Sequence, residues 1–368
     1  MFLPGLELCK RFYWEAVRPV LARRFPHLKH AAALMDGGSE VLGFDDALST
    51  DHHWGPRLQL FVAEEDWGMA EAIKASLAHE LPYEFLGYPT NFSAPDPNDN
   101  GVQLLEAIAS GPVNHRVVVQ TARRFVLAHL GFDLAQPLEA ADWLTFAEQR
   151  LRTMRSGAVY HDEVGLQAVR ERFAYYPRDV WLYLLAAGWT RIGQEEHLMG
   201  RAGMVGDEVG SALIGARLAR DVMRLGFLME KTYAPYPKWF GTAFKQLDCA
   251  AELLPRLQAA LHAASWQERE AQLVQAYERL AARHNALRLT EPMPEQAISF
   301  FGRPFQVMAL HGFAEALCRQ IEDEAVKQIA ARPLIGSLDL WSDSTDLVSN
   351  PAWRRQIRAF YEPDAPMG

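Results

Sequence analysis

The sequence lacks the features that mark secreted, disulfide-bonded or membrane-spanning proteins. Its 368 residues contain only three cysteines, Cys9, Cys249 and Cys318, which are too widely spaced to form a local disulfide framework or a CxxC metal site. No uncharged apolar run reaches the roughly 20 residues that a bilayer requires. The charged start MFLPGLELCKRFYWEAV is not typical of a signal peptide. We therefore expect a cytoplasmic protein with buried, reduced thiols and no membrane partner.

Basic clusters are also missing. The formal net charge is -9 at pH 7, and the sequence has no block of Lys and Arg of the kind that follows a phosphodiester backbone. This argues against a dedicated DNA- or RNA-binding protein, although a pocket for one nucleotide needs only a few cations. Hydrophobic residues make up 49% and charged residues 23%, which is ordinary for a globular protein. The chain is long enough for two domains with separate cores.

The pattern of apolar residues changes near Gln136-Pro137. Before it, strands are expected at 31–35, 58–62, 83–87 and 116–121. From Leu138 onward every periodic segment is helical, and we expect no strand there. We therefore predict an α+β fold, with a mixed-sheet α/β domain at 1–136 and an all-α helical bundle domain with a polar C-terminal tail at 137–368.

The densest run of chemistry is STDHHWGPR (49–57). A Ser/Thr/Asp cluster before a strand can simply hydrogen-bond its own turn. The DHH triplet also names a class of manganese phosphoesterases. That two-metal chemistry needs further aspartates on an earlier strand, and none of Asp36, Asp45 and Asp46 follows a strand in the D-x-D-A manner of those enzymes. The phosphoesterase interpretation is the least favoured of those considered for this run.

The glycines upstream favour another chemistry. Gly38-Ser39 precedes Asp51 with a spacer of eleven residues. This arrangement resembles the signature of DNA polymerase beta-like nucleotidyltransferases. In that signature, backbone N–H groups and a hydroxyl approach a triphosphate. Two alternate strand residues then face a divalent metal. Here those residues would be Asp51, as the catalytic metal ligand, and His53, with His52 pointing away.

A closer resemblance rests on three longer runs, "GGSEVLGFDDALSTDHHWGPRLQLFV", "YEFLGYPTNF" and "YAPYPKWFGTAF". They resemble a bacterial domain-of-unknown-function family of nucleotidyltransferase-like proteins, over nearly the whole chain. The resemblance implies a nucleotidyltransferase fold joined to a helical domain similar to that of aminoglycoside nucleotidyltransferases. It supplies no acceptor substrate.

The same resemblance suggests roles for individual residues. Gly38 and Ser39 would bind the phosphates of the nucleotide, and Arg57 the charge of the leaving pyrophosphate. In the helical domain, Glu196 would be the base for the acceptor hydroxyl and Lys238 a phosphate ligand. Two structural interpretations compete with the last pair. The run 191–210 is also typical of a solvated, ion-paired helix pair, and the run 230–241 of an aromatic helix corner.

The departure from the signature concerns the metal. Neutral imidazole is a poor ligand for Mg²⁺, so His53 favours Mn²⁺ or Zn²⁺. Enzymes with this signature carry a third metal-binding carboxylate on a later strand. The expected strand at 116–121 has no carboxylate at its centre, and Glu84 on the preceding strand is the alternative ligand. We predict transfer of a nucleoside monophosphate from an NTP such as ATP to a hydroxyl group of a small molecule. The divalent metal cofactor would be Mg²⁺ or Mn²⁺, with Zn²⁺ as the alternative. The alternative is a catalytically degenerate nucleotide- or metal-binding module. The chain is compatible with a homodimer.

The C-terminal run GSLDLWSDSTD (336–346) concentrates aspartates. It could form a second acidic site. A surface loop rich in Asx and ST turns is the favoured interpretation.

Overall fold

The computed structural model describes residues 2–51, 53–99 and 101–362. Its internal contacts divide the chain into two compact units. The first, named here the sheet unit, comprises Met1–Pro137 and Arg150–Ala174. The second, the helical unit, comprises Leu138–Gln149 and Tyr175–Gly368. The sheet unit thus adds residues 150–174 to the predicted segment 1–136.

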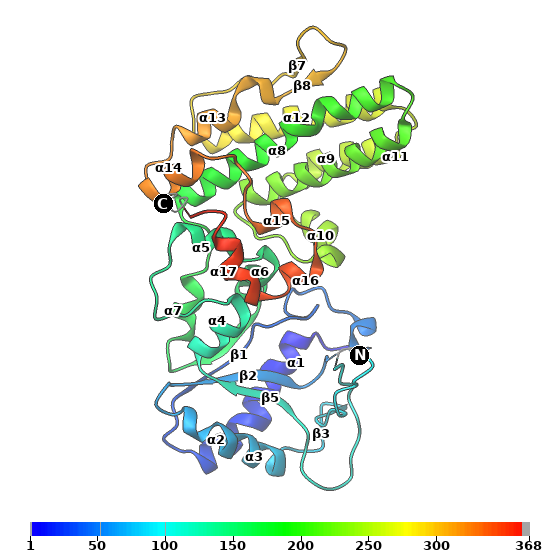
Figure 1. Cartoon of the computed structure of the whole chain (residues 1–368). Helices are drawn as coiled ribbons and strands as arrows, with labels where there is room; N and C mark the ends of the chain where they lie inside the picture. The colour runs from blue at the N-terminus through cyan, green and yellow to red at the C-terminus, as the bar shows by residue number, and fades with distance from the viewer. Residues whose placement is uncertain (1, 52, 100, 363–368) are drawn as a thin grey trace. The chain divides into compact units, whose positions relative to one another are not determined.

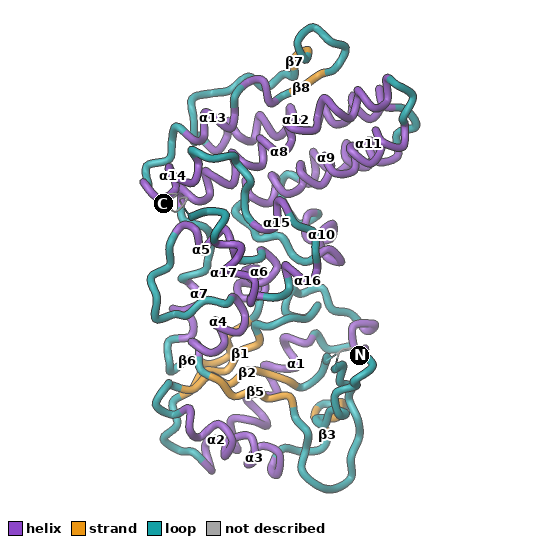
Figure 2. The backbone as a smooth tube through the Cα atoms, in the orientation of Figure 1, coloured by secondary structure: helices purple, strands orange, loops and turns teal. Residues whose placement is uncertain are grey.

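A four-stranded mixed sheet organises the sheet unit. Its strands are β1 (His30–Leu34), β2 (Arg57–Val62), β5 (Arg116–Gln120) and β6 (Ala158–Asp162), in the spatial order β5-β2-β1-β6. β1 is antiparallel to both β2 and β6, whereas β2 is parallel to β5. Figure 2 shows these strands in orange. β1 and β2 are buried along their whole length, and the predicted mixed sheet is confirmed.

The expectation of no strand after Leu138 is wrong. β6 pairs with the open edge of β1, with Ala32 opposite His161. In its sequence AVYHD the first four residues are half-buried and Asp162 is exposed, so burial does not alternate along the strand and the run carries no period-2 signal. A second strand pair, β7 (Ile298–Ser299) with β8 (Gln306–Val307), lies in the helical unit. β6 therefore depends on pairing with a strand far away in the sequence, whereas β7 and β8 form a short hairpin of two residues each.

Helices cover the sheet and supply its core. Residues 5–24 form α1 (Gly5–Phe12), a π-helical turn (Tyr13–Val17) and α2 (Arg18–Arg24). The interruption lies just before Pro19, which has no N–H to continue the helical ladder. Buried side chains of these helices and of the sheet share one core with α3 (Ala70–Glu80). The unit is completed by a 3-10 turn (Trp67–Met69), the hairpin β3 (Glu84–Phe85) and β4 (Tyr88–Pro89), α4 (Ala122–Leu130), most of α6 (Glu148–Ser156), and α7 (Leu166–Glu171).

Four long helices form the framework of the helical unit. α8 (Arg178–Met204), α9 (Glu208–Met229), α11 (Ala250–His262) and α12 (Trp266–Leu287) lie side by side, as Figure 1 shows in green and yellow. Their mutual packing confirms the predicted helical bundle. The shorter helices are α5 (Ala140–Thr145), α10 (Pro237–Phe244), α13 (Phe313–Cys318), α14 (Glu324–Ala330), α15 (Leu338–Trp341), α16 (Thr345–Val348) and α17 (Arg354–Arg358). Within the described residues, no helix combines the length and apolarity needed to traverse a bilayer.

The close approach of β6 to β1 can be tested at Gly157. A Cβ atom there would press against the carbonyl oxygen of Leu34 and lie 2.8 Å from the Cα atom of Met35. Because both obstacles are backbone, we expect Gly157→Ala to lower the free energy of unfolding by about 1–3 kcal/mol. Urea denaturation measures this change. Gly68→Ala is the matched control, since nothing lies within 4 Å of its added Cβ. Equal stability of the two variants would contradict the packing.

Candidate functional site

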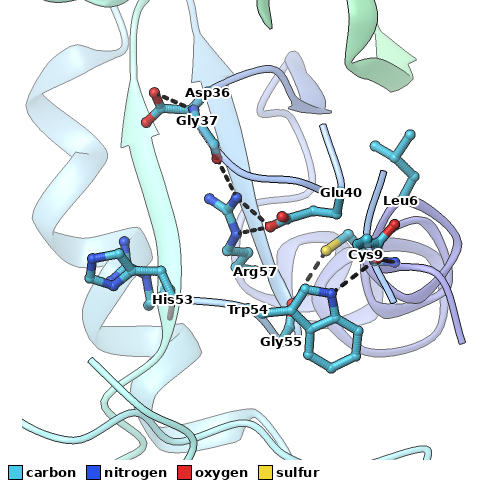
Figure 3. Close-up of polar contacts among 12 residues, drawn as sticks. Leu6, Cys9, Asp36, Gly37, Glu40, His53, Trp54, Gly55 and Arg57 are labelled. Carbon is cyan, nitrogen blue, oxygen red and sulfur yellow. Dashed lines mark hydrogen bonds and ion pairs between the residues drawn. The ribbon is translucent and has the colours of Figure 1, made fainter. Parts of the chain in front are cut away.

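A glycine turn directly after β1 is fastened to the sheet by a buried ion pair. Arg57 is the first residue of β2, and its Nε lies 3.0 Å from Glu40 Oε1. Its Nη2 donates to the carbonyl oxygen of Gly37 at 2.7 Å, as Figure 3 shows. Burial alone would lower the pKa of Arg57, but the charge and hydrogen bond of Glu40, together with electrostatic interactions with Cys9 and Asp36, raise this pKa above its ordinary value. Arg57 therefore keeps its charge, and the ion pair holds the turn at the edge of β2.

Gly38 is required in this turn. Its φ of +134° is rarely adopted by L side chains, and an added Cβ would lie against Glu40 and 2.8 Å from Arg57 Nη2. The predicted phosphate-binding residues Gly38 and Ser39 are thus brought next to Arg57. The guanidinium itself is engaged with protein groups, so the contact seen here positions the turn. Its predicted contact with pyrophosphate stays a prediction.

A second arginine lies at the same edge. Arg116 begins β5 and is the register partner of Arg57 across the parallel pair. Its Nη1 donates to Gln103 Oε1 at 2.7 Å and lies 2.6 Å from His53 Nδ1. Burial, and next the charge of Arg57, lower the pKa of Arg116. Positive charge is therefore concentrated beside the glycine turn, and no sequence motif marks Arg116 as part of it.

Asp36 is the exposed carboxylate of this edge. It follows β1 closely, and its side chain is 58% exposed. One carboxylate oxygen accepts the N–H of Gly37 at 2.8 Å and lies 3.8 Å from His129 Nδ1. Its charge also acts on Arg116 and Arg150. The sequence signal for Asp36 was its place as the first polar residue after a buried apolar strand.

The strand geometry expected for Asp51 and His53 is wrong. Residues Ala47–Asp51 form a 3-10 helix, and β2 begins only at Arg57. His53 has a φ of +50°, and its N–H donates to Gln103 O at 3.1 Å. This pairing with a loop residue takes the chain out of the extended conformation, so the period-2 argument does not apply. The side chain of Asp51 and all of His52 lie outside the described residues.

The described side chains of this edge do not fit a two-metal carboxylate centre. Glu40 is already paired with Arg57, and β5 presents the sequence RVVVQ, without a carboxylate. The alternative ligand Glu84 is an exposed residue of the β3–β4 hairpin. His53 Nδ1 faces the cation of Arg116. An edge of this composition suits an anion better than a cation.

The two candidates in the helical unit lie in different environments. Glu196 is a buried residue of α8 whose carboxylate accepts the N–H groups of Met308 at 2.8 Å and Ala309 at 3.0 Å. Burial raises its pKa to about 7, a value suited to a general base. Lys238 is exposed in the first turn of α10, with Nζ 5.0 Å from the centre of the Trp239 ring. Among the described contacts, none joins Glu196 to Lys238.

A cavity of about 450 Å³ lies elsewhere in the helical unit. It is lined by Arg191, Gln194, Arg217, Arg220, Pro333, Leu334, Ile335, Leu340, Trp341 and Asp343. Arg191 pairs with Glu195 at 3.1 Å on α8, and Arg220 of α9 pairs with Asp343 at 2.7 Å. The ion-paired helix interpretation of the run 191–210 is thus confirmed for Arg191. The cavity combines cations with apolar walls, a lining that suits a small anionic ligand.

The run YAPYPKWF forms an aromatic corner around a buried carboxylate. Tyr233 packs against Tyr175, with ring centres 5.0 Å apart, and the N–H of Ala234 donates to Glu148 Oε2 at 2.8 Å. Burial and the neighbouring Asp339 raise the pKa of Glu148 to about 7. Asp339 itself is buried and accepts the N–H of Glu148. The surface-loop interpretation is therefore wrong for Asp339, because this distant partner draws it inside.

Comparison with known proteins finds a family model that matches part of the chain. Residues 143–240 match a domain of unknown function (DUF4037). This confirms the predicted resemblance to a domain-of-unknown-function family over that segment. A solved structure similar to this chain is the nucleotidyltransferase-like protein from Exiguobacterium sibiricum 255-15, at 9% identity and a TM-score of 0.32, covering 76% of this chain and 81% of that one. No curated protein matches the chain.

The buried ion pair is testable by removing one charge. Glu40→Gln leaves Arg57 buried without its carboxylate, so we expect the free energy of unfolding to fall by about 3–5 kcal/mol. Chemical denaturation measures the loss. Glu71→Gln is the control, because that exposed carboxylate pairs with Lys74 at the surface and should cost less than about 1 kcal/mol. Similar losses in both variants would show that the pair does not hold the turn.

Glu196 should make stability depend on pH. Its pKa is about 7 in the folded protein against an ordinary 4.5, so the folded state binds the extra proton. This contribution is fully present below pH 4.5 and is lost as the pH rises through 7, amounting to at most about 3 kcal/mol. Glu196→Gln cannot titrate. We therefore expect the unfolding free energy of wild type, relative to this variant, to fall between pH 4.5 and 7.5. Parallel pH profiles would contradict the raised pKa.

Proposed function

We propose that the sheet unit binds the phosphates of a nucleoside triphosphate where β1 ends and β2 and β5 begin. In this proposal the protein transfers the nucleoside monophosphate to a hydroxyl group of a small molecule. The observation that carries the proposal is the turn Gly37–Ser39 held beside Arg57 and Arg116. The predicted Gly-Ser element and two arginines meet at one edge of the sheet, although they come from three separate parts of the chain.

The turn offers backbone donors to an anion. No acceptor within the described part of the chain is bonded to the amides of Gly38 and Ser39. These two N–H groups can therefore donate to a phosphate oxygen. The half-buried Ser39 adds a hydroxyl donor. These groups, rather than a long basic surface, would bind the phosphates, in keeping with the acidic net charge of the chain.

Electrostatics support the same assignment. Arg57 and Arg116 are neighbours across β2 and β5, and the charge of Arg57 helps to lower the pKa of Arg116. A phosphate beside the two guanidinium groups would relieve this repulsion. Each charge-assisted hydrogen bond contributes roughly 1.5–3 kcal/mol. The edge is thus arranged for an anion before any ligand arrives.

The transfer itself needs further groups, and we propose them as the sequence suggested. Asp51 and His53 are proposed as metal ligands, Glu196 as the base and Lys238 as a second phosphate ligand. The acceptor in this proposal is a small molecule with a hydroxyl group. The described residues of the sheet edge would bind and orient the phosphates.

A second candidate is a nucleotide-binding module that no longer catalyses transfer. It is favoured by the scarcity of available carboxylates at the edge, where Asp36 is exposed but Glu40 is engaged by Arg57 and β5 contributes none. Both candidates share the phosphate site. They differ only in whether pyrophosphate is released.

Nucleotide binding should depend on Arg116. Replacing it by glutamine removes one charged donor beside the turn, so we expect Arg116→Gln to weaken ATP binding by about tenfold to a hundredfold. Isothermal titration calorimetry measures the dissociation constant. Arg155→Gln is the control, since Arg155 forms an exposed pair with Glu171 and should leave the affinity unchanged. An unaltered affinity in Arg116→Gln, with the fold intact, would remove the proposed edge as the phosphate site.

Pyrophosphate release separates the two candidates. The full chain is incubated with labelled ATP, GTP, CTP or UTP, candidate hydroxyl acceptors, and Mg²⁺, Mn²⁺ or Zn²⁺. Release of pyrophosphate with transfer of label to an acceptor supports the transferase. Tight binding without release supports the binding module. If no nucleotide binds at all, both candidates fail.

A further inference from the structure

A second polar cluster lies at the opposite end of β1 from the glycine turn. It comprises His30, the first residue of β1, His161 in β6, and Glu163 just after β6. Ligand atoms of the three side chains all lie within 4.8 Å of one another. The backbone N–H of Glu163 donates to His30 O at 3.0 Å. Pairing of β6 with β1 therefore brings these side chains together and keeps their spacing.

The distances are close to those of a coordination shell. Glu163 Oε2 lies 2.9 Å from His161 Nε2 and 3.9 Å from His30 Nδ1. Ligands about 2.0 Å from a tetrahedral Zn²⁺ are separated by roughly 3.3 Å. Small side-chain rotations would therefore complete the shell. Two imidazoles and one carboxylate form a ligand set that favours Zn²⁺ and other borderline metals over Mg²⁺ and Ca²⁺.

The buried surroundings orient His30. The hydroxyl group of Tyr13, which is fully buried, lies 2.9 Å from His30 Nε2. If Nδ1 binds a metal, Nε2 carries the proton and donates to this hydroxyl oxygen, which is the usual support for a histidine ligand. Metal binding at Nδ1 would replace the contact between Nδ1 and the carbonyl oxygen of Leu28, which at 3.2 Å is longer than the contact with Tyr13. The ring of Tyr13 also stacks on His161 at 5.8 Å.

The protonation states suit metal binding as well. Burial lowers the pKa of His30, so its imidazole is neutral at pH 7, as a ligand must be. The contact with His161 lowers the pKa of Glu163, which keeps the carboxylate ionised. The side chain of Glu163 is 47% exposed and that of His161 21%. A metal can therefore enter from solvent, and water can take the fourth position.

We propose that His30, His161 and Glu163 bind one borderline divalent metal ion such as Zn²⁺, and that this ion fastens β6 to β1. The site is separate from the proposed nucleotide edge and stands whether or not that proposal holds. β6 belongs to the segment Arg150–Ala174, which is part of the sheet unit although it follows residues of the helical unit in the sequence. The ion would therefore stabilise the attachment of this segment to the sheet.

The test is Zn²⁺ titration of the full chain after dialysis against a chelator. Calorimetry should show one Zn²⁺ bound at this site, with a higher melting temperature in Zn²⁺ than in Mg²⁺. His161→Ala and Glu163→Gln should each weaken Zn²⁺ binding at least about tenfold. Co²⁺ in place of Zn²⁺ should give the visible absorption of a tetrahedral site, lost in both variants.

Two further variants serve as controls. His27→Ala removes a nearby exposed histidine and should leave Zn²⁺ affinity unchanged. His53→Ala tests the other metal position considered above and should leave this site intact. The proposal is overturned if Zn²⁺ does not bind, or if folded His161→Ala and Glu163→Gln bind it as tightly as wild type.

Discussion

The buried pair between Arg57 and Glu40 is the interaction on which the arrangement of the proposed phosphate site depends. A guanidinium at the start of a buried strand must find a carboxylate, because an unpaired buried charge would cost several kcal/mol. Glu40 meets this need only if residues 37–40 turn back over the end of β1. In the same turn, the carbonyl oxygen of Gly37 accepts a hydrogen bond from Arg57, and no room is left for a side chain at Gly38. One electrostatic requirement thus determines the conformation of the glycine turn.

Other buried polar contacts extend this anchoring along the loop between β1 and β2. Trp54 is buried, and its Nε1 donates to Asp45 Oδ2 at 3.1 Å, which also accepts the N–H of Gly5 at 2.7 Å. The Sγ of Cys9 donates to Gly55 O at 3.4 Å (Figure 3), and burial raises the pKa of this thiol to about 12. Cys9 is therefore a packed donor rather than a reactive group. Long loops usually vary in conformation, and here side chains of α1 and β2 restrain one.

Each unit brings charged side chains together, at the edge of its sheet or in its interior. The edge of the sheet unit concentrates arginines, whereas the helical unit buries the carboxylates of Glu148, Glu196 and Asp339. Burial raises the pKa of Glu148 and Glu196 to about 7, yet Glu148 accepts the N–H of Ala234 and Glu196 those of Met308 and Ala309, which hold both carboxylates in place. Carboxylates with raised pKa values are often functional. Here the hydrogen bonds that these carboxylates accept also join segments that lie far apart in the sequence.

The sequence by itself determined the elements whose signal is local. β2 and β5 could be predicted because each is a short apolar or β-branched run, and the bundle because its helices are periodic over many turns. The Gly38-Ser39 turn was recognisable for the same reason. Only the tertiary structure decided which distant groups meet: β6 with β1, Arg57 with Glu40, Glu196 with Met308 and Ala309, and His30 with His161. Such pairings leave no periodic trace in the sequence, since each partner is an ordinary residue of its own segment. They arise when burial of one polar group requires a partner from elsewhere in the chain.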